Sequence, residues 1–274
     1  MTGSPDMIER PTRRRFITLT AAAAGMSLAP RIAQCAKPKT LRWRGVALGA
    51  EASLLLQHPD EAHAKMSLSA CLAEVDRLER IFSLHRPDSA LVRLNRDGRI
   101  DDAPADLRLL LSEALTLCRE TNGAFDPTIQ PLWALYTRHF ASPDADPQGP
   151  AMRDIAEAKA RTGWQHVILD GGMVRFGKLG MAMTLNGIAQ GYITDKAADL
   201  LRDLGFENVL INLGEQRALG PQSDGRPWRA GVRDPKDPVR ILTEIELSGL
   251  AMATSSGAAL AFDRPGRFAH ILNP

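Results

Sequence analysis

The sequence has few cysteines, little net charge and no long hydrophobic run, and these shortages exclude several classes of protein. Its three cysteines form no Cys-x-x-Cys pair and accompany no His-rich spacing, which argues against a structural zinc site. Cys71 and Cys118 each lie within an apolar helical pattern, so we expect two buried thiols, with a disulfide between them as the alternative. A net charge of +2, part of which comes from N-terminal arginines, argues against a nucleic-acid partner.

The N-terminal apolar stretch is too short to cross a membrane. Residues Ile17–Ala29 make up about a dozen positions, whereas a helix that spans a bilayer needs about 20. The preceding segment Thr12–Ile17, TRRRFI, has the order of residues that the twin-arginine translocase reads. This succession of basic, apolar and small residues predicts a twin-arginine signal peptide over residues 1–36, and therefore export to the periplasm as a folded protein. A basic N-terminus on a cytosolic protein is the alternative.

Apolar periodicity over residues 37–274 predicts one α+β domain. Clustered strand patterns separated by long helical patterns favour mixed, largely antiparallel sheets with flanking long helices over a regular parallel winding. Helices are expected at residues 62–82, 90–95, 105–121, 153–162 and 189–204. Strands are expected at residues 41–57, 166–170, 173–176, 182–185, 209–213, 228–232, 241–247 and 251–255. The Pro- and Asp-rich segment 141–150 is expected to be a surface loop.

Two sequence blocks at the ends of predicted elements suit a ligand with a ring and a phosphate. In Thr121–Thr128, TNGAFDPT, Phe125 offers a flat apolar face and Asp126 supplies carboxylate oxygens at a turn. The same Asp-Pro-Thr order is also a common helix start, which is the more usual meaning of this block alone. In Leu185–Tyr192, LNGIAQGY, a strand runs into a helix whose free backbone amides suit a phosphate, although the glycine spacing differs from that of dinucleotide-binding loops.

Three further blocks bring hydroxyl, amide and carboxylate groups to strand ends. They are Ile211–Glu215, INLGE, then Ala253–Gly257, ATSSG, and finally Phe268–Pro274, FAHILNP. The last contains His270, and a lone histidine is more often a structural residue than a catalytic one.

In this order, the five blocks resemble those of the ApbE family, flavin transferases that move FMN from FAD onto a threonine or serine of a target protein. The resemblance covers about residues 43–274 and includes the segment Leu48–Ala50 and the loop Phe82–Ser89. It implies a T-fold-related architecture, FAD as the flavin donor, Mg²⁺ as the metal and a flavoprotein as the acceptor. The signal peptide and the segment Ala47–Glu51 are most similar to the NosX branch, which is associated with nitrous-oxide reductase maturation and implies a NosR-like membrane protein as the acceptor.

The resemblance also implies roles for individual residues. Leu48 takes the place of the family's usual Met, and His85 that of its usual Tyr. Thr184 takes the place of an Asp and Gln190 that of a Lys, so one anionic and one cationic contact both become neutral. Gly187 would supply a backbone oxygen to magnesium. The implied FAD-binding residues are Leu48, His85, Ala124, Phe125, Asp126, Thr184, Gln190 and Ile271.

The implied chemistry is magnesium-assisted phosphoryl transfer to a protein hydroxyl, with AMP as the leaving group. His270 is the candidate for the transfer of the hydroxyl proton. Family members continue into a Thr-Gly turn and an Ala-Asp-Ala-x-Ser/Thr segment whose side chains hold magnesium, so we expect this chain, which stops at Pro274, to be truncated at its C-terminus. A non-catalytic protein that binds or donates FAD is the alternative function, and a flavin-free scaffold is a third.

Overall fold

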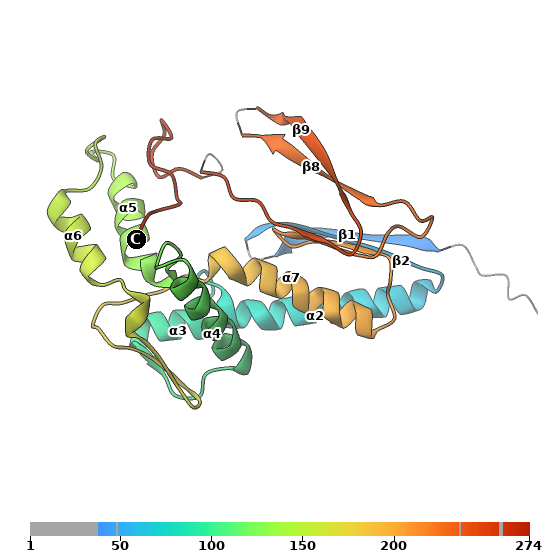
Figure 1. The fold of residues 1–274 in the computed structure, drawn as a ribbon, viewed down its shortest axis with the longest axis horizontal. Helices are drawn as coiled ribbons and strands as arrows, with labels where there is room; N and C mark the ends of the chain where they lie inside the picture. The colour runs from blue at the N-terminus through green and yellow to red at the C-terminus, as the bar shows by residue number, and fades with distance from the viewer. Residues whose placement is uncertain (1–37, 48, 236, 258–259) are drawn as a thin grey trace, which may run out of the picture. The chain divides into compact units, whose positions relative to one another are not determined.

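The computed structural model describes residues 38–47, 49–235, 237–257 and 260–274 (Figure 1). The predicted signal peptide and the predicted flavin-binding residue Leu48 lie outside the described residues. Residues Pro38–Pro274 form one compact unit. Within the described residues, no helix combines the length and the apolar character needed to cross a membrane.

A five-stranded antiparallel sheet is the centre of this unit. Its strand order is β1-β2-β6-β7-β10, with β1 at Lys39–Ala47, β2 at Ala50–His58, β6 at Val209–Asn212, β7 at Gln216–Leu219 and β10 at Ala251–Met252. Alternate residues of β2 and β6, such as Leu54 and Ile211, are fully buried, and these two residues are paired in the β2–β6 register. This period-2 alternation directs one face of the sheet into the core.

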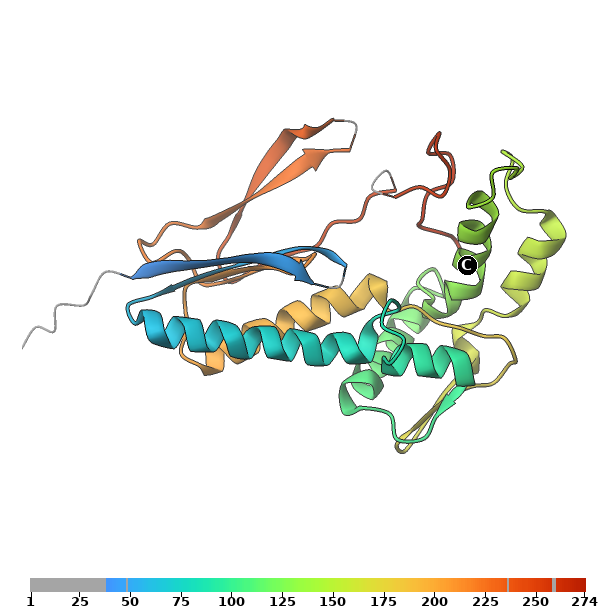
Figure 2. The same cartoon turned by 180° about the vertical axis from the view of Figure 1, so that it is seen from behind.

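Helices α2, Glu61–Phe82, and α7, Asn186–Asp203, cover that face (Figures 1 and 2). Asp60 begins α2, since its carboxylate accepts hydrogen bonds from the backbone N–H groups of Ala62 (2.9 Å) and His63 (3.0 Å). The buried stripe of α7 consists mainly of small and aliphatic residues, which lets the helix lie close to α2 and the sheet. These residues are Ala189, Ile193, Thr194, Ala197, Ala198 and Leu201.

A polar network connects α7 to α2 and to α4, Ala105–Glu120. The Tyr192 hydroxyl donates to Asp106 Oδ1 (2.7 Å), and Arg77 Nη1 lies 2.8 Å from Asp106 Oδ2. Burial opposes ionisation of Asp106, but the hydrogen bonds from Tyr192 and Arg77 outweigh it and lower the pKa of the carboxyl.

Helices and a small sheet form the other end of the unit. The sheet has the order β3-β5-β4, with β3 at Arg99–Ile100, β4 at Val167–Asp170 and β5 at Met173–Phe176. The helices are α3, Ala90–Asp97, α4, Ala105–Glu120, α5, Gln130–Phe140, and α6, Met152–Ala160, with short 3₁₀ turns η1, Pro127–Ile129, and η2, Trp164–His166.

The hairpin of β8, Trp228–Asp234, and β9, Asp237–Leu247, lies on the face of the main sheet that is turned away from α2 and α7 (Figure 1). Its base is anchored there, because Trp228, Ala230 and Leu247 form a small buried cluster with Ala218. Leu55, Leu210 and Met252, which are partly buried, pack against this cluster from the main sheet.

The predicted α+β class and antiparallel sheets are confirmed, and the predicted helices occur close to their expected bounds. The expectation of two buried free thiols is also confirmed for Cys71 and Cys118, and burial raises the pKa of each to about 12. The expected strand at residues 41–57 is instead a hairpin that turns at Gly49, where φ is +76°. The strand expected at 251–255 ends at Met252, and helix α7 begins three residues earlier than expected.

The strand expected at residues 182–185 does not form. The side chain of Asn95 takes the place of a strand partner, because its amide donates to Met183 O (2.8 Å) and its oxygen accepts from Met183 N (2.8 Å). Thr184 N then donates to Pro127 O (2.8 Å). These contacts satisfy an extended backbone without any neighbouring strand.

Candidate functional site

The turn between α4 and α5 is built around the buried carboxylate of Asp126. Its Oδ1 accepts hydrogen bonds from Thr128 N (2.8 Å) and Thr128 Oγ1 (2.7 Å), and its Oδ2 accepts from Trp164 N (3.1 Å). Thr128 Oγ1 also accepts from Gly163 N (2.7 Å). Asp126 is 8% exposed and Thr128 is fully buried, so these four bonds lock two turns together that are far apart in the sequence.

Phe125 extends from this locked turn to the start of α7. A methyl group added at Gly187 would lie 3.4 Å from Phe125 Cε2, which is ordinary van der Waals contact. Phe125 is half-buried, whereas Ala124 and Gly187 are exposed. The result is a flat apolar surface beside the first backbone amides of a helix, an arrangement that suits a planar ring joined to an anionic group.

The turn between β6 and β7 contacts α7 one helical turn further along. Gly214 has a φ of +98°, and a methyl group there would lie 2.5 Å from Gln190 Nε2. The backbone conformation therefore favours glycine, and any larger residue would also displace the end of the Gln190 side chain. Gly214 N donates to Asn212 Oδ1 (3.2 Å), which closes the turn.

The same turn reaches the segment that follows β10. Glu215 Oε2 accepts a hydrogen bond from Thr254 N (3.2 Å). Burial raises the pKa of the Glu215 carboxyl, and the Thr254 amide opposes this shift only in part. Further along this segment, a methyl group added at Gly257 would lie 3.4 Å from Ala269 Cβ, next to His270.

His270 is held by the backbone of Leu260. Its Nδ1 lies 2.8 Å from Leu260 O, and its backbone N–H donates to the same oxygen (3.1 Å). A carbonyl oxygen can only accept, so Nδ1 carries the proton in this contact and Nε2 of the neutral ring has the lone pair. This is the tautomer that a proton acceptor at Nε2 requires.

The segment around His270 is a small antiparallel loop that packs on α5. Ala261 and Ala269 form a β-bridge, and Phe262 N donates to Phe268 O (2.8 Å). The rings of Phe262 and Phe268 pack on Tyr136 of α5, with centroid distances of 5.5 and 5.8 Å. Trp133 and Phe140 complete this aromatic cluster. Ile271, just beyond it, is 54% exposed.

Comparison with known proteins identifies the family of this chain. The chain matches the model of the ApbE family over residues 48–274. The chain belongs to the ApbE family. Its fold superposes on the apo form of the flavinyl transferase ApbE from Pseudomonas stutzeri with a TM-score of 0.72 and 28% identity, over 86% of this chain and 75% of that one. The flavin transferase ApbE from Vibrio cholerae gives a TM-score of 0.73 and 26% identity, over 86% and 76% of the two chains.

Curated relatives extend the comparison. The chain is 31% identical to an FAD:protein FMN transferase of Vibrio cholerae over 255 residues, which are 89% of this chain and 74% of the relative. It is 30% identical to one of Klebsiella pneumoniae over 228 residues, or 78% and 63% of the two chains. For one of Haemophilus influenzae, identity is 29% and coverage is 70% and 58%. The chain thus spans between 58% and 74% of the length of these three relatives.

The ApbE-type residues predicted from the sequence fall into three groups. Ala124, Phe125 and Asp126 share one turn, which Thr184 joins through Pro127, and Gly187 and Gln190 lie on the first turns of α7 beside it. His270 and Ile271 belong to the C-terminal loop, which packs against Gly257 through Ala269. His85 is exposed on the loop after α2, and within the described residues no hydrogen bond or ion pair joins it to the Asp126 turn or to α7.

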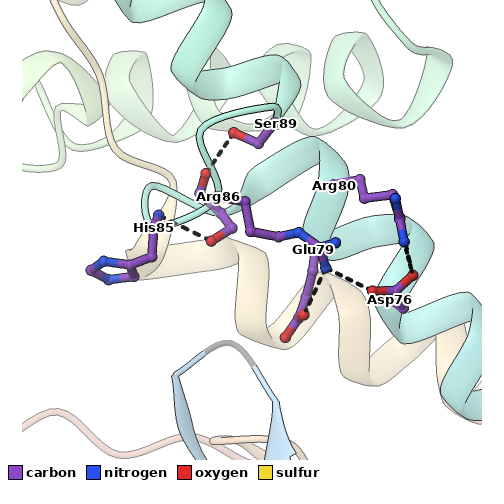
Figure 3. A network of polar contacts seen from close by, with 7 residues as sticks. Asp76, Glu79, Arg80, His85, Arg86 and Ser89 are labelled. Carbon is purple, nitrogen blue, oxygen red and sulfur yellow. Dashed lines mark hydrogen bonds and ion pairs between the residues drawn. The ribbon is translucent and has the colours of Figure 1, made fainter.

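The loop that carries His85 is rigidly built (Figure 3). The backbone N–H of His85 donates to Ser83 Oγ (3.1 Å). Ser89 Oγ donates to Ser83 O (2.6 Å) and also caps the N-terminus of α3. Arg86 pairs with Asp76 of α2 at 2.7 Å. Figure 3 shows the imidazole of His85 pointing away from this ion pair, which leaves the ring free to contact a ligand.

Magnesium does not fit the described residues alone. Gly187 offers only backbone atoms, and in the part of the chain that the structure describes no group of three or more His, Cys, Asp or Glu side chains could hold a metal ion. A magnesium site needs several oxygen ligands in octahedral geometry. The described residues therefore do not form a complete magnesium site by themselves.

The sequence did not indicate the parts of the site that are distant in the chain. Gly163 and Trp164 were not among the candidates, although their backbone amides bind Thr128 and Asp126. A weak signal in the sequence is the glycine at position 163, directly after the predicted helix at 153–162. In the structure this glycine has a φ of +127°, a conformation that only glycine adopts readily.

Proposed function

We propose that this protein transfers FMN from FAD to a threonine or serine hydroxyl of a target protein, with release of AMP. The proposal rests on the match to the ApbE family together with two features of the structure: the Phe125 face beside the start of α7, and His270, whose Nδ1 is held by Leu260 O. FAD is the flavin donor and the second substrate is a flavoprotein.

The reaction needs one bond formed and one broken. The acceptor oxygen attacks the phosphorus of the FMN half of FAD, the bridging P–O bond breaks, and AMP leaves with the bridging oxygen. The hydroxyl proton passes to His270 Nε2, which has the lone pair when Nδ1 is bonded to Leu260 O, and then to solvent.

The remaining residues position FAD. Phe125 contacts one face of the isoalloxazine ring, which lies across Ala124 and Gly187. The Gly187 amide donates to the FMN phosphate, whereas the neighbouring amides of Asn186 and Ile188 are bonded to Thr184 Oγ1 and Leu185 O. His85 and Ile271, both exposed, are available to contact the flavin. Thr184 and Gln190 add neutral hydrogen-bonding groups, and Asp126 sets the position of the turn.

Magnesium is part of the proposal through the family resemblance, with the Gly187 carbonyl as one ligand. It would neutralise charge on the phosphates. EDTA should abolish AMP release and added Mg²⁺ should restore it. Unchanged transfer in EDTA would remove the metal from the proposal.

The cellular setting belongs to the proposal too. The twin-arginine signal suits a protein that folds around FAD in the cytoplasm and then carries it to the periplasm, where a NosR-like membrane protein of nitrous-oxide reductase maturation is the acceptor. Replacing Arg13 and Arg14 by Lys should strand the protein in the cytoplasm, as measured by fractionation. Continued export of this variant would contradict the twin-arginine route and leave the transferase proposal intact.

Incubation with FAD, Mg²⁺ and the periplasmic domain of a NosR-like protein tests the activity. The expected result is flavin fluorescence that stays on the acceptor in a denaturing gel, with one AMP released per flavin attached. An acceptor whose target Thr is replaced by Val is the control. FAD binding without covalent flavin or AMP would favour the non-catalytic accessory protein, and no FAD binding at all would favour a flavin-free scaffold.

A further inference from the structure

We propose that Glu215 is a positioning residue whose carboxylate holds the segment 253–257 against the end of the main sheet and thereby fixes the position of His270. The role of His270 rests on the proposed function, whereas the hold on the segment does not. Apart from the packing of Gly214 against Gln190, the turn 212–215 and the segment 253–257 have no role in the proposed flavin transfer.

The turn that presents Glu215 is itself rigid. It joins β6 to β7 directly, Leu213 N donates to Glu215 O (3.1 Å), and Gly214 N donates to Asn212 Oδ1 (3.2 Å). The Gln190 side chain of α7 packs over Gly214. The Glu215 carboxylate therefore projects from a backbone that is fixed on both sides.

The carboxylate bonds to a segment that has little regular structure of its own. Strand β10 ends at Met252, which pairs with Gln216, and residues 253–256 have neither helical nor strand structure. Glu215 Oε2 accepts from Thr254 N (3.2 Å), two residues beyond the end of the strand. A hydrogen bond to a charged group is stronger than one between neutral groups, and partial burial strengthens it further.

The held segment leads to His270 through a packing contact. Gly257 lies against Ala269, close enough that a methyl group on Gly257 would be 3.4 Å from Ala269 Cβ. On its other side the His270 loop packs on the aromatic residues of α5. Packing on α5 and on the segment 253–257 thus fixes the position of His270. Glu215 bonds this segment to the main sheet, on which α7 packs.

The expected effect of losing this support is on turnover and not on flavin affinity. Among the described residues the Glu215 carboxylate bonds to Thr254 and not to Phe125 or Gly187, so Glu215→Ala should leave the FAD dissociation constant within twofold of the original. A displacement of a proton acceptor by about 1 Å can lower turnover about 100-fold. We expect kcat to fall 10- to 100-fold with little change in KM for FAD.

Two measurements on the full chain test the proposal without any turnover. Hydrogen exchange at the Thr254 amide should be at least tenfold faster in Glu215→Ala, and the Cε1–H resonance of His270 should shift. Glu215→Gln keeps an oxygen acceptor and should restore most of both. Glu246→Ala, an exposed glutamate on β9, is the matched control and should change neither.

Several results would overturn the proposal. Unchanged Thr254 exchange in Glu215→Ala refutes the hold on the segment, and faster exchange with an unshifted His270 resonance refutes the link to His270. If Glu215→Ala does not fold, Thr254→Pro removes the same hydrogen bond from the donor side and must give the same His270 shift. If the unaltered protein lacks transferase activity but both spectroscopic effects occur, the proposed function fails while the positioning by Glu215 is supported.

Discussion

Thr128 offers the sharpest test of how the flavin-facing turn is held. In Thr128→Val the shape of this fully buried side chain is kept, but its hydroxyl no longer donates to Asp126 Oδ1 or accepts from Gly163 N, both at 2.7 Å. A bond to a buried carboxylate contributes about 2 kcal/mol and a backbone amide left without a partner costs about 1 kcal/mol or more, so the loss should be about 3 kcal/mol. Thr128→Ser keeps the hydroxyl and removes one methyl group, at a cost of about 1 kcal/mol.

Urea unfolding followed by circular dichroism measures the difference between these two variants. The valine variant should be about 2 kcal/mol less stable than the serine variant. It should also bind FAD more weakly, because Phe125 is displaced when the turn around Asp126 loosens. Equal unfolding free energies for the two variants would refute the account of this network.

Three further changes test other parts of the structure. Gly187→Trp should fill the surface beside Phe125 and weaken FAD binding at least tenfold in a fluorescence titration, whereas Gly187→Ala, whose methyl group fits at 3.4 Å, should not. Tyr192→Phe should cost about 2 kcal/mol at pH 7. The pKa of Asp106 is lowered from 3.8 in the folded protein, so that contribution is fully present above pH 3.8 and is lost as the pH falls through the folded pKa. The difference from the original protein should therefore shrink as the pH is lowered below 3.8, and a constant difference would contradict this assignment. Phe268→Ala should free the His270 loop from Tyr136 and Phe140 and speed hydrogen exchange over residues 260–270, with Phe268→Leu as the milder control.

Local sequence patterns were sufficient to predict the elements that are determined by residues close to one another in the chain. The helix expected at residues 62–82 begins at Glu61, one residue from the predicted start. The prediction was accurate because the apolar spacing and the Asp60 cap are both local features of the sequence. The hairpin of β4 and β5 was likewise predictable from a Gly-Gly turn between two short apolar runs.

Elements that depend on distant residues were predicted less well. Residues 182–185 have the composition of a strand, but Asn95 binds this backbone from 88 positions earlier in the chain. Helix α5 was not among the predicted helices. Its aromatic residues pack on the loop 260–270, which is more than 100 positions away in the chain, so no local pattern accounts for them.

The same reasoning applies to the site. Phe125, Asp126 and Gly187 could be singled out because each occurs in a block at the end of an element. The backbone amide of Trp164, which bonds to Asp126 from 38 positions away, could not. The sequence likewise placed Glu215 in a polar block but gave no sign of its bond to Thr254, because that contact joins two strand ends 39 residues apart.

In the proposed reaction, the protein cleaves FAD between its two phosphorus atoms and attaches the FMN half to the acceptor. FAD labelled with ³²P at the FMN phosphorus, and separately at the AMP phosphorus, tests this most directly. We predict that the first label becomes covalently attached to the acceptor protein and that the second is released as AMP. Both labels on the acceptor, or neither, would exclude this cleavage and transfer.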